Sequence, residues 1–148
     1  MQRFFKLALI FSIITPVMVT ACRVPEPVDN FDELLDRLRQ AEAAVEVSTR
    51  TGSSLHLSVV GRLITVNKEN VMVFEYEDVT SAKMETEALA GGGPGLVFFE
   101  EDQPPVTEIL SGRKHYYRSG RFILTYSGEN EIVLQPLKGV VGRPFEIR

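Results

Sequence analysis

A nine-residue segment in the C-terminal half of the chain holds many of the side chains that could recognise an anion. It contains four fixed positive charges, one imidazole and two phenols: Arg113, Lys114, His115, Tyr116, Tyr117, Arg118 and Arg121. Arginine pairs with carboxylates and phosphates through parallel hydrogen bonds, and tyrosine packs against ring systems. The segment is therefore a candidate contact for a small anionic ligand.

Alternation along a strand divides this segment between two faces. If it is extended, the even-numbered positions 114, 116 and 118 face one side of a sheet, and positions 113, 115 and 117 face the other. At most half of the cluster can then form one surface. The competing interpretation is a hairpin whose exposed charges keep its edge from pairing with another chain.

The sequence shows no further pattern typical of catalysis or cofactor binding. His56 and His115 lack a second histidine or a cysteine at metal-ligand spacing, and the acidic run at 100–102 lacks the spaced oxygens of a calcium loop. The glycine-rich run at 91–95 is not followed by the lysine of a phosphate-binding loop. We therefore predict no catalytic residue, no metal and no cofactor.

The first twenty-two residues have the organisation of an export signal. A basic start with Arg3 and Lys6 precedes apolar residues 7–19, a stretch shorter than the roughly 20 residues of a membrane-spanning helix. The final residues, Val19-Thr20-Ala21-Cys22, resemble the lipobox of bacterial lipoproteins. In that family the signal peptide is cut before the cysteine, and a diacylglycerol is attached to its thiol, usually with an amide-linked acyl chain such as palmitate.

The resemblance implies a signal peptide at 1–21 and a membrane anchor on Cys22, the single cysteine. Two or more acyl chains hold a protein firmly on a bilayer. The resemblance implies the cell membrane or the outer membrane, facing outside the cytoplasm. Arg23 stands where an aspartate would act as a retention signal, which favours the outer membrane in organisms that have two. Loss of Arg3 and Lys6 with the signal peptide would change the formal charge from −4 to −6.

The remaining chain suits one domain. We expect a lipidated cysteine and a proline-containing spacer at 22–30, followed by a single domain at 31–148, a length usual for one hydrophobic core. The acidic balance argues against nucleic acid as a partner, because such partners select basic surfaces.

Hydrophobic periodicity predicts an α+β domain. Asp29 or Asn30 caps an amphipathic helix over 31–45. Residues 46–60 are mixed in character, with a loop at 51–54, and a hairpin pairs 62–66 with 71–76. Asp78 or Thr80 caps a weaker helix to about residue 90. Candidate strands follow at 96–99 and 106–110.

A second hairpin pairs 115–118 with 121–126. Asn130 then caps a last helix that Pro136 makes short, kinked or absent. The predicted order is α-β-β-α-β-β-α. It corresponds to a small antiparallel sheet built from two hairpins, with one face covered by two or three helices.

Residues 60–67, 71–76 and 115–121 resemble segments of a group of small uncharacterised bacterial exported proteins, many with a lipoprotein signal. The resemblance implies an α+β domain and export, and it transfers no catalytic residue. The chain departs from that pattern at Pro136 and at the glycine-rich run 91–95.

Three functions follow from these observations. The first is a lipid-anchored cell-envelope protein that binds an envelope protein or polymer without catalysis. The second is an exported, hydrolase-like enzyme in which His115 acts with Tyr116 or Tyr117 and an acid from a distant strand. The third is a structural or assembly protein that docks a partner.

Overall fold

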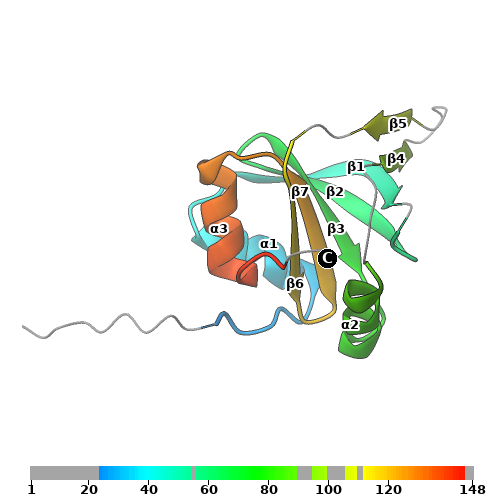
Figure 1. The fold of residues 1–148 in the computed structure, drawn as a ribbon. Helices are drawn as coiled ribbons and strands as arrows, with labels where there is room; N and C mark the ends of the chain where they lie inside the picture. The colour runs from blue at the N-terminus through cyan, green and yellow to red at the C-terminus, as the bar shows by residue number, and fades with distance from the viewer. Residues whose placement is uncertain (1–23, 55, 90–94, 100–105, 110–111, 146–148) are drawn as a thin grey trace, which may run out of the picture.

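The computed structural model describes residues 24–54, 56–89, 95–99, 106–109 and 112–145. In this part of the chain, one antiparallel sheet of seven strands packs against three helices (Figure 1). The predicted α+β class is thereby confirmed. Cys22 and the predicted signal peptide lie outside the described residues.

The elements follow one another along the chain with short connections. They are α1 (Phe31–Gln40), β1 (Val45–Ser54), β2 (Val60–Val66), β3 (Glu69–Glu75), α2 (Val79–Ala88), β4 (Gly95–Phe99), β5 (Val106–Ile109), β6 (Lys114–Ser119), β7 (Phe122–Ser127) and α3 (Glu131–Val141). The order across the sheet is β5-β4-β1-β2-β3-β7-β6.

The sheet is larger than the two predicted hairpins. Both hairpins form, and they join where β3 pairs with β7. The predicted loop at 51–54 was wrong, because these residues belong to β1. Thr51, placed in a loop by its polar neighbours, pairs with Arg62 of β2 and Phe99 of β4. Backbone pairing on both sides outweighs the weak strand preference of this polar sequence.

Both faces of the central strands are buried. Along β3, Val71 and Val73 face a core shared with α1 and α3, whereas Met72 and Phe74 face a second core shared with α2. Two helices therefore cover one face of the sheet, and the third packs on the opposite face (Figure 1).

Helix α1 begins as predicted and ends early. The Asn30 side chain accepts a hydrogen bond from the backbone of Glu33, whose carboxylate accepts one from the backbone of Asp29. At the other end Glu42 adopts a φ of +62°, which turns the chain into β1. The predicted helical position Val45 is consequently the first residue of β1.

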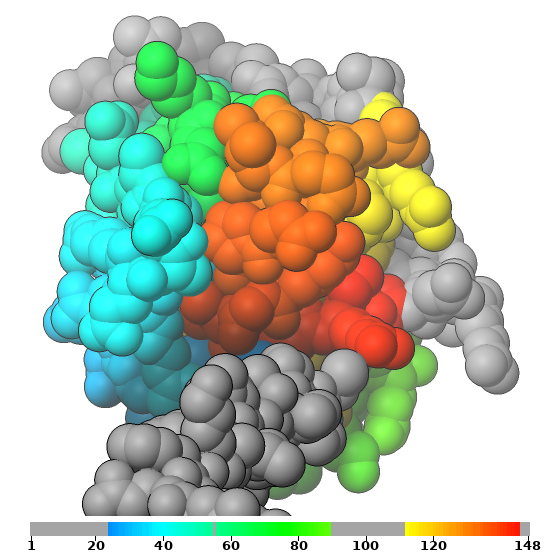
Figure 2. Space-filling model, turned by 90° about the vertical axis from the view of Figure 1, so that its left-hand side faces the viewer, coloured from blue at the N-terminus to red at the C-terminus, as the bar shows by residue number. Residues whose placement is uncertain are grey.

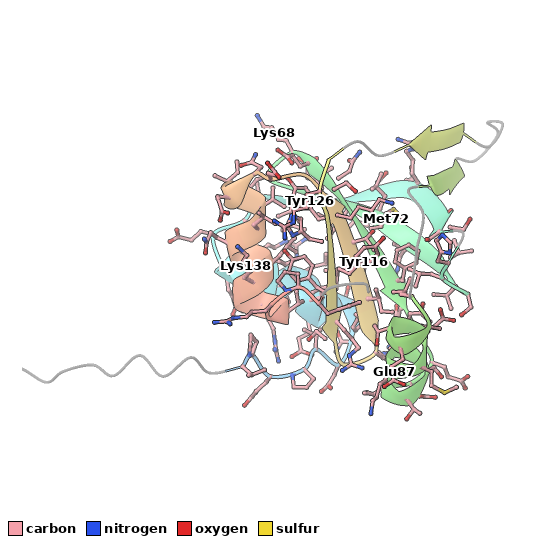
Figure 3. The ribbon with its side chains drawn as sticks, in the orientation of Figure 1. Lys68, Met72, Glu87, Tyr116, Tyr126 and Lys138 are labelled. Atoms are coloured by element: carbon pink, nitrogen blue, oxygen red, sulfur yellow. The ribbon has the colours of Figure 1, made fainter. Side chains whose placement is uncertain are left out.

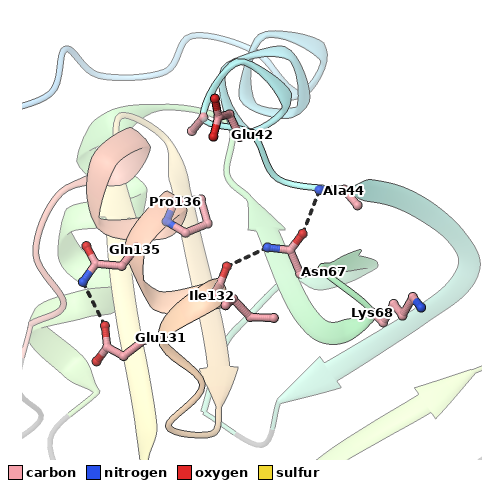
Figure 4. A pocket seen from close by; sticks show the side chains of 9 residues that line it. Glu42, Ala44, Asn67, Lys68, Glu131, Ile132, Gln135 and Pro136 are labelled. Atoms are coloured by element: carbon pink, nitrogen blue, oxygen red, sulfur yellow. Dashed lines mark hydrogen bonds between the residues drawn. The ribbon is translucent and has the colours of Figure 1, made fainter.

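Helix α3 runs through Pro136 without breaking. Proline has no backbone N–H, so the carbonyl of Ile132, four residues earlier, loses its helical partner. The Asn67 side chain, on the turn between β2 and β3, donates a hydrogen bond of 2.6 Å to that carbonyl (Figure 4). A side chain from outside the helix thus replaces the missing bond, which is why the predicted disruption by Pro136 does not occur.

Asn67 connects three parts of the fold. Its side-chain oxygen accepts from the backbone of Ala44 at 2.9 Å, and its own N–H donates to the Ala44 carbonyl at 2.8 Å. It also adopts a φ of +51°, which asparagine tolerates better than most residues. One residue therefore ties the start of β1, the β2–β3 turn and α3 together.

The second half of the predicted spacer belongs to the domain. Val28 is 1% exposed in the core, and its N–H donates to the Ser119 hydroxyl at 3.1 Å. Arg37 of α1 donates to the Glu26 carbonyl at 2.7 Å, and Arg121 donates to the Asp29 carbonyl at 3.1 Å. The chain before α1 is consequently bound to helix α1, to strand β6 and to the β6–β7 turn.

A double-mutant cycle tests the bond between Asn67 and α3. We expect Asn67→Ala to lower the free energy of unfolding by about 2 kcal/mol, through two lost hydrogen bonds. In a Pro136→Ala background the new N–H can bond to Ile132, so the same change should cost about 1 kcal/mol less. Urea unfolding of the four proteins measures this coupling.

Asn70→Ala, on the same hairpin but exposed, is the matched control and should show no coupling with Pro136→Ala. Equal costs of Asn67→Ala in both backgrounds would contradict the assigned role of this side chain.

Candidate functional site

A groove of about 720 Å³ opens where α1 ends, the β2–β3 turn reverses and α3 begins (Figures 2 and 4). We call it the α1–α3 groove. In Figure 2 the segments around it are α1 and the chain after it in blue to cyan, the turn in green and α3 in orange. Its lining residues are Ala41, Glu42, Ala44, Asn67, Lys68, Glu131, Ile132, Gln135 and Pro136.

The groove combines small and apolar surfaces with a charged rim. Ile132 is 58% exposed, unusual for a large aliphatic side chain, and it lies beside Pro136. Glu42 and Glu131 contribute carboxylates on the two helical sides (Figure 4). Lys68 extends outward from the tip of the turn (Figure 3).

The backbone around the groove is unusual. Among the described residues, the non-glycine positions with positive φ are Glu42, Asn67 and Lys68, and all three line it. Conformations of this kind persist where the surrounding contacts hold them, and they often occur at ligand-binding sites. Here Asn67 and Lys68 form the two-residue turn of the β2–β3 hairpin, which requires positive φ at both positions. Glu42 follows α1, where the backbone N–H of Ala43 donates to the carbonyl of Leu38, so local bonds and the Asn67 side chain shape the rim of the groove.

A partly buried polar cluster holds the start of α3 against the sheet. The Tyr126 hydroxyl donates to one oxygen of Glu69, and the Asn130 side chain donates to the other at 2.5 Å. The side-chain oxygen of Asn130 caps α3 by accepting from the backbone of Ile132. Glu69 therefore positions the helix residues that line the groove.

The two hydrogen bonds change the acidity of Glu69. Donation from Tyr126 and from Asn130 favours the carboxylate and lowers the pKa of Glu69 below its ordinary value. The pKa of Tyr126 is raised to about 12, first by burial and then by its bond to Glu69. The pair is thus a neutral phenol donating to a charged carboxylate over the physiological range.

The side chains of the predicted ligand segment, residues 113–121, lie on both faces of the sheet, as strand alternation requires. It forms β6, an edge of the sheet. Tyr117 is fully buried beneath α3, and burial raises its pKa to about 12. Tyr116 packs on the opposite face near Phe145, and Arg118 is exposed close to the β6–β7 turn. The segment therefore provides no single ligand surface.

Two members of the segment, Arg113 and His115, line a second hollow of about 460 Å³. It also contains Glu129, Glu131 and Lys138. The His115 ring stacks on Tyr126 at 6.1 Å, and its Nε2 lies 3.0 Å from the carbonyl of Gly128. Two glutamates therefore line the same hollow as His115. Neither tyrosine of the enzyme hypothesis lines it, since Tyr117 is buried and Tyr116 lies on the opposite face of the sheet.

Arg121 takes part in a separate ion cluster at the other end of β6. Its guanidinium lies 2.5 Å from one oxygen of Glu75, and Arg62 pairs with the other. Arg62 also stacks on Phe31, 3.6 Å from the ring centre. This cluster attaches the start of α1 to the sheet, so Arg121 has a structural partner and lies apart from His115.

Sequence reasoning missed the α1–α3 groove. Its residues come from three segments that are distant in the chain, and none has a catalytic pattern. Two signals were present: the Asn67-Lys68 pair in a hairpin turn, and Pro136 within a helical pattern that needs an outside donor. Neither signal identifies the partner of the other without the fold.

No protein-family model, curated protein or solved structure matches this chain. Within the described ranges, no helix is long and apolar enough to span a membrane. The same part of the chain contains no group of three histidine, cysteine, aspartate or glutamate side chains placed to hold a metal ion. The likeness to exported bacterial proteins remains a prediction.

The Glu69 cluster predicts a pH dependence of stability. Because the folded-state pKa of Glu69 is below its ordinary value of 4.5, its stabilising effect is present above pH 4.5 and is lost as the pH falls through the folded-state value. We expect Glu69→Gln to lower the melting temperature by several degrees at neutral pH, and this difference should shrink in acid.

Calorimetry across this pH range measures both quantities. Glu46→Gln changes an exposed acid on β1 and serves as the control, with little expected effect. A deficit of Glu69→Gln that stays constant down to strongly acidic pH would contradict the assigned ionisation.

Proposed function

We propose that this chain is a lipid-anchored protein of the cell envelope that binds a partner protein in the α1–α3 groove without catalysis. The anchor is the lipid expected on Cys22. The observation that carries the binding role is the exposed groove itself, in which Ile132, 58% exposed, and Pro136 lie with the carboxylates of Glu42 and Glu131.

The chemistry of the groove favours one kind of occupant. Ile132 and Pro136 offer apolar contact, and the carboxylates of Glu42 and Glu131 stand on either side. Glu131 already accepts from Gln135 at 2.9 Å and lies 3.8 Å from Lys138, and both Glu131 and Glu42 are exposed. A partner segment with an aliphatic or aromatic residue beside a lysine or arginine complements this surface.

Intact-mass spectrometry of the protein purified from membranes tests the anchor. We expect the mass of residues 22–148 plus acyl chains, and we expect Cys22→Ala to lose both the added mass and the membrane association. An unmodified full-length mass in the wild type would contradict the anchored protein.

Site-directed photo-crosslinking tests the groove. With a photoreactive phenylalanine analogue at Gln135, an exposed lining residue, we expect a cross-link to a partner segment that is apolar and basic when sequenced. Ile132→Asp should weaken this interaction about tenfold or more, since it removes apolar contact and adds charge.

Val79→Asp is the matched control for this experiment. Val79 is 57% exposed and lies on α2, on the other face of the sheet, so its substitution should leave the cross-link unchanged. An acidic partner segment, or equal effects of the two substitutions, would contradict the proposed occupant.

A further inference from the structure

We infer that the packed spacer fixes how the domain stands on the membrane, with the β6–β7 turn and the C-terminal end of α3 facing the lipid headgroups. This inference rests on the proposed lipid anchor at Cys22. It adds a second interaction surface, whose partner is the bilayer itself, and it places the α1–α3 groove at the far end of the domain.

The free part of the tether is very short. Cys22 and Pro25 are three residues apart, a distance that even a fully extended chain limits to about 11 Å. From Glu26 onward the chain is bound to the domain through Arg37, Ser119 and Arg121. The lipid attachment point is therefore confined to the neighbourhood of Pro25.

Contacts show which end of the domain Pro25 occupies. A Cβ placed on Gly142, the residue that ends α3, would lie 3.8 Å from Pro25 Cδ. One placed on Gly120, in the β6–β7 turn, would lie 3.6 Å from Pro27 and 2.5 Å from the Val28 carbonyl oxygen. The spacer thus runs beneath the end of α3 and the tip of the last hairpin (Figure 1).

The side chains at this end suit a headgroup layer. Val24 is 87% exposed, the highest value among the exposed large apolar residues of the described chain, and it lies two positions from Cys22. Arg118 precedes the β6–β7 turn and Arg143 follows α3, and both are exposed, as are the acids Glu26 and Asp29 of the spacer. An aliphatic side chain can enter the boundary of the acyl region, while guanidinium groups donate to lipid phosphates.

The groove lies at the opposite end of the same helix. Helix α3 contains 11 residues and is about 16 Å long, from Glu131 at the groove to Val141 beside the spacer. The tip of the β2–β3 turn, with Lys68, is likewise at the end away from the spacer (Figure 3). A domain held at Pro25 therefore presents the groove to the aqueous side.

Short-range fluorescence quenching tests this orientation. Since lipid would occupy the only native thiol, a cysteine introduced by Arg118→Cys or by Lys68→Cys is the sole site for a thiol-reactive fluorophore. The purified lipoprotein is placed in phosphatidylcholine vesicles that contain a lipid spin-labelled at its headgroup. We expect several-fold stronger quenching at position 118 than at position 68.

A lengthened tether provides the control. Ten glycine and serine residues inserted between Arg23 and Val24 leave every contact of the domain intact and add a flexible span of about 17 Å. The difference between positions 118 and 68 should then largely disappear. Equal quenching at both positions without the insertion, or an unchanged difference with it, would overturn the orientation.

The mass of each labelled protein separates the two proposals. A lipidated protein with equal quenching at both positions overturns the orientation and leaves the anchor intact. A protein without lipid overturns the anchor and, with it, the orientation that depends on it.

Discussion

The hydrogen bond from Asn67 to the Ile132 carbonyl is the contact on which the arrangement of the helices depends. Pro136 leaves that carbonyl without its helical donor, and the hairpin turn supplies one from another part of the chain. Because the same side chain also holds Ala44, the end of α1, the β2–β3 turn and the start of α3 are fixed relative to one another. The α1–α3 groove is the space that remains between these three fixed segments.

Polar clusters at the two ends of the sheet complete this framework. Near the groove, the Glu69 carboxylate accepts hydrogen bonds from Tyr126 and Asn130 and so holds the start of α3. At the other end, Glu75 is shared by Arg62 and Arg121, next to the first residues of α1. Both carboxylates are engaged in structure, and removing either would leave its former partners without their acceptor. The apolar cores bind the layers together, while these clusters determine the positions of the helix ends.

The sequence predicts local structure well where the evidence is local. Asn130 caps its helix as predicted, and Asn30 and Asp78 are each one of the two predicted alternatives, because a capping side chain bonds within its own first turn. Prediction from the sequence fails where contacts between residues distant in the chain determine the secondary structure. Thr51 lies in a strand because β2 and β4 flank it, and α3 survives Pro136 because Asn67 reaches it. The groove could not be predicted for the same reason, since three distant segments line it. The charged segment at 113–121 forms no common surface because strand alternation places its side chains on two faces of the sheet.

The close approach of Gly120 to Val28 also has a consequence for the order of folding. The hydrogen bond between Val28 and Ser119 joins residues 91 positions apart, so the first part of the domain to be synthesised closes against one of the last. Until the β6–β7 turn has formed, Val28 lacks Ser119 and Asp29 lacks Arg121, and the contacts named above that remain to the spacer are local ones with α1, such as the bond from Arg37 to the Glu26 carbonyl. A lipid-bearing chain would therefore complete its spacer contacts, and with them the single orientation inferred above, only once its last hairpin has folded.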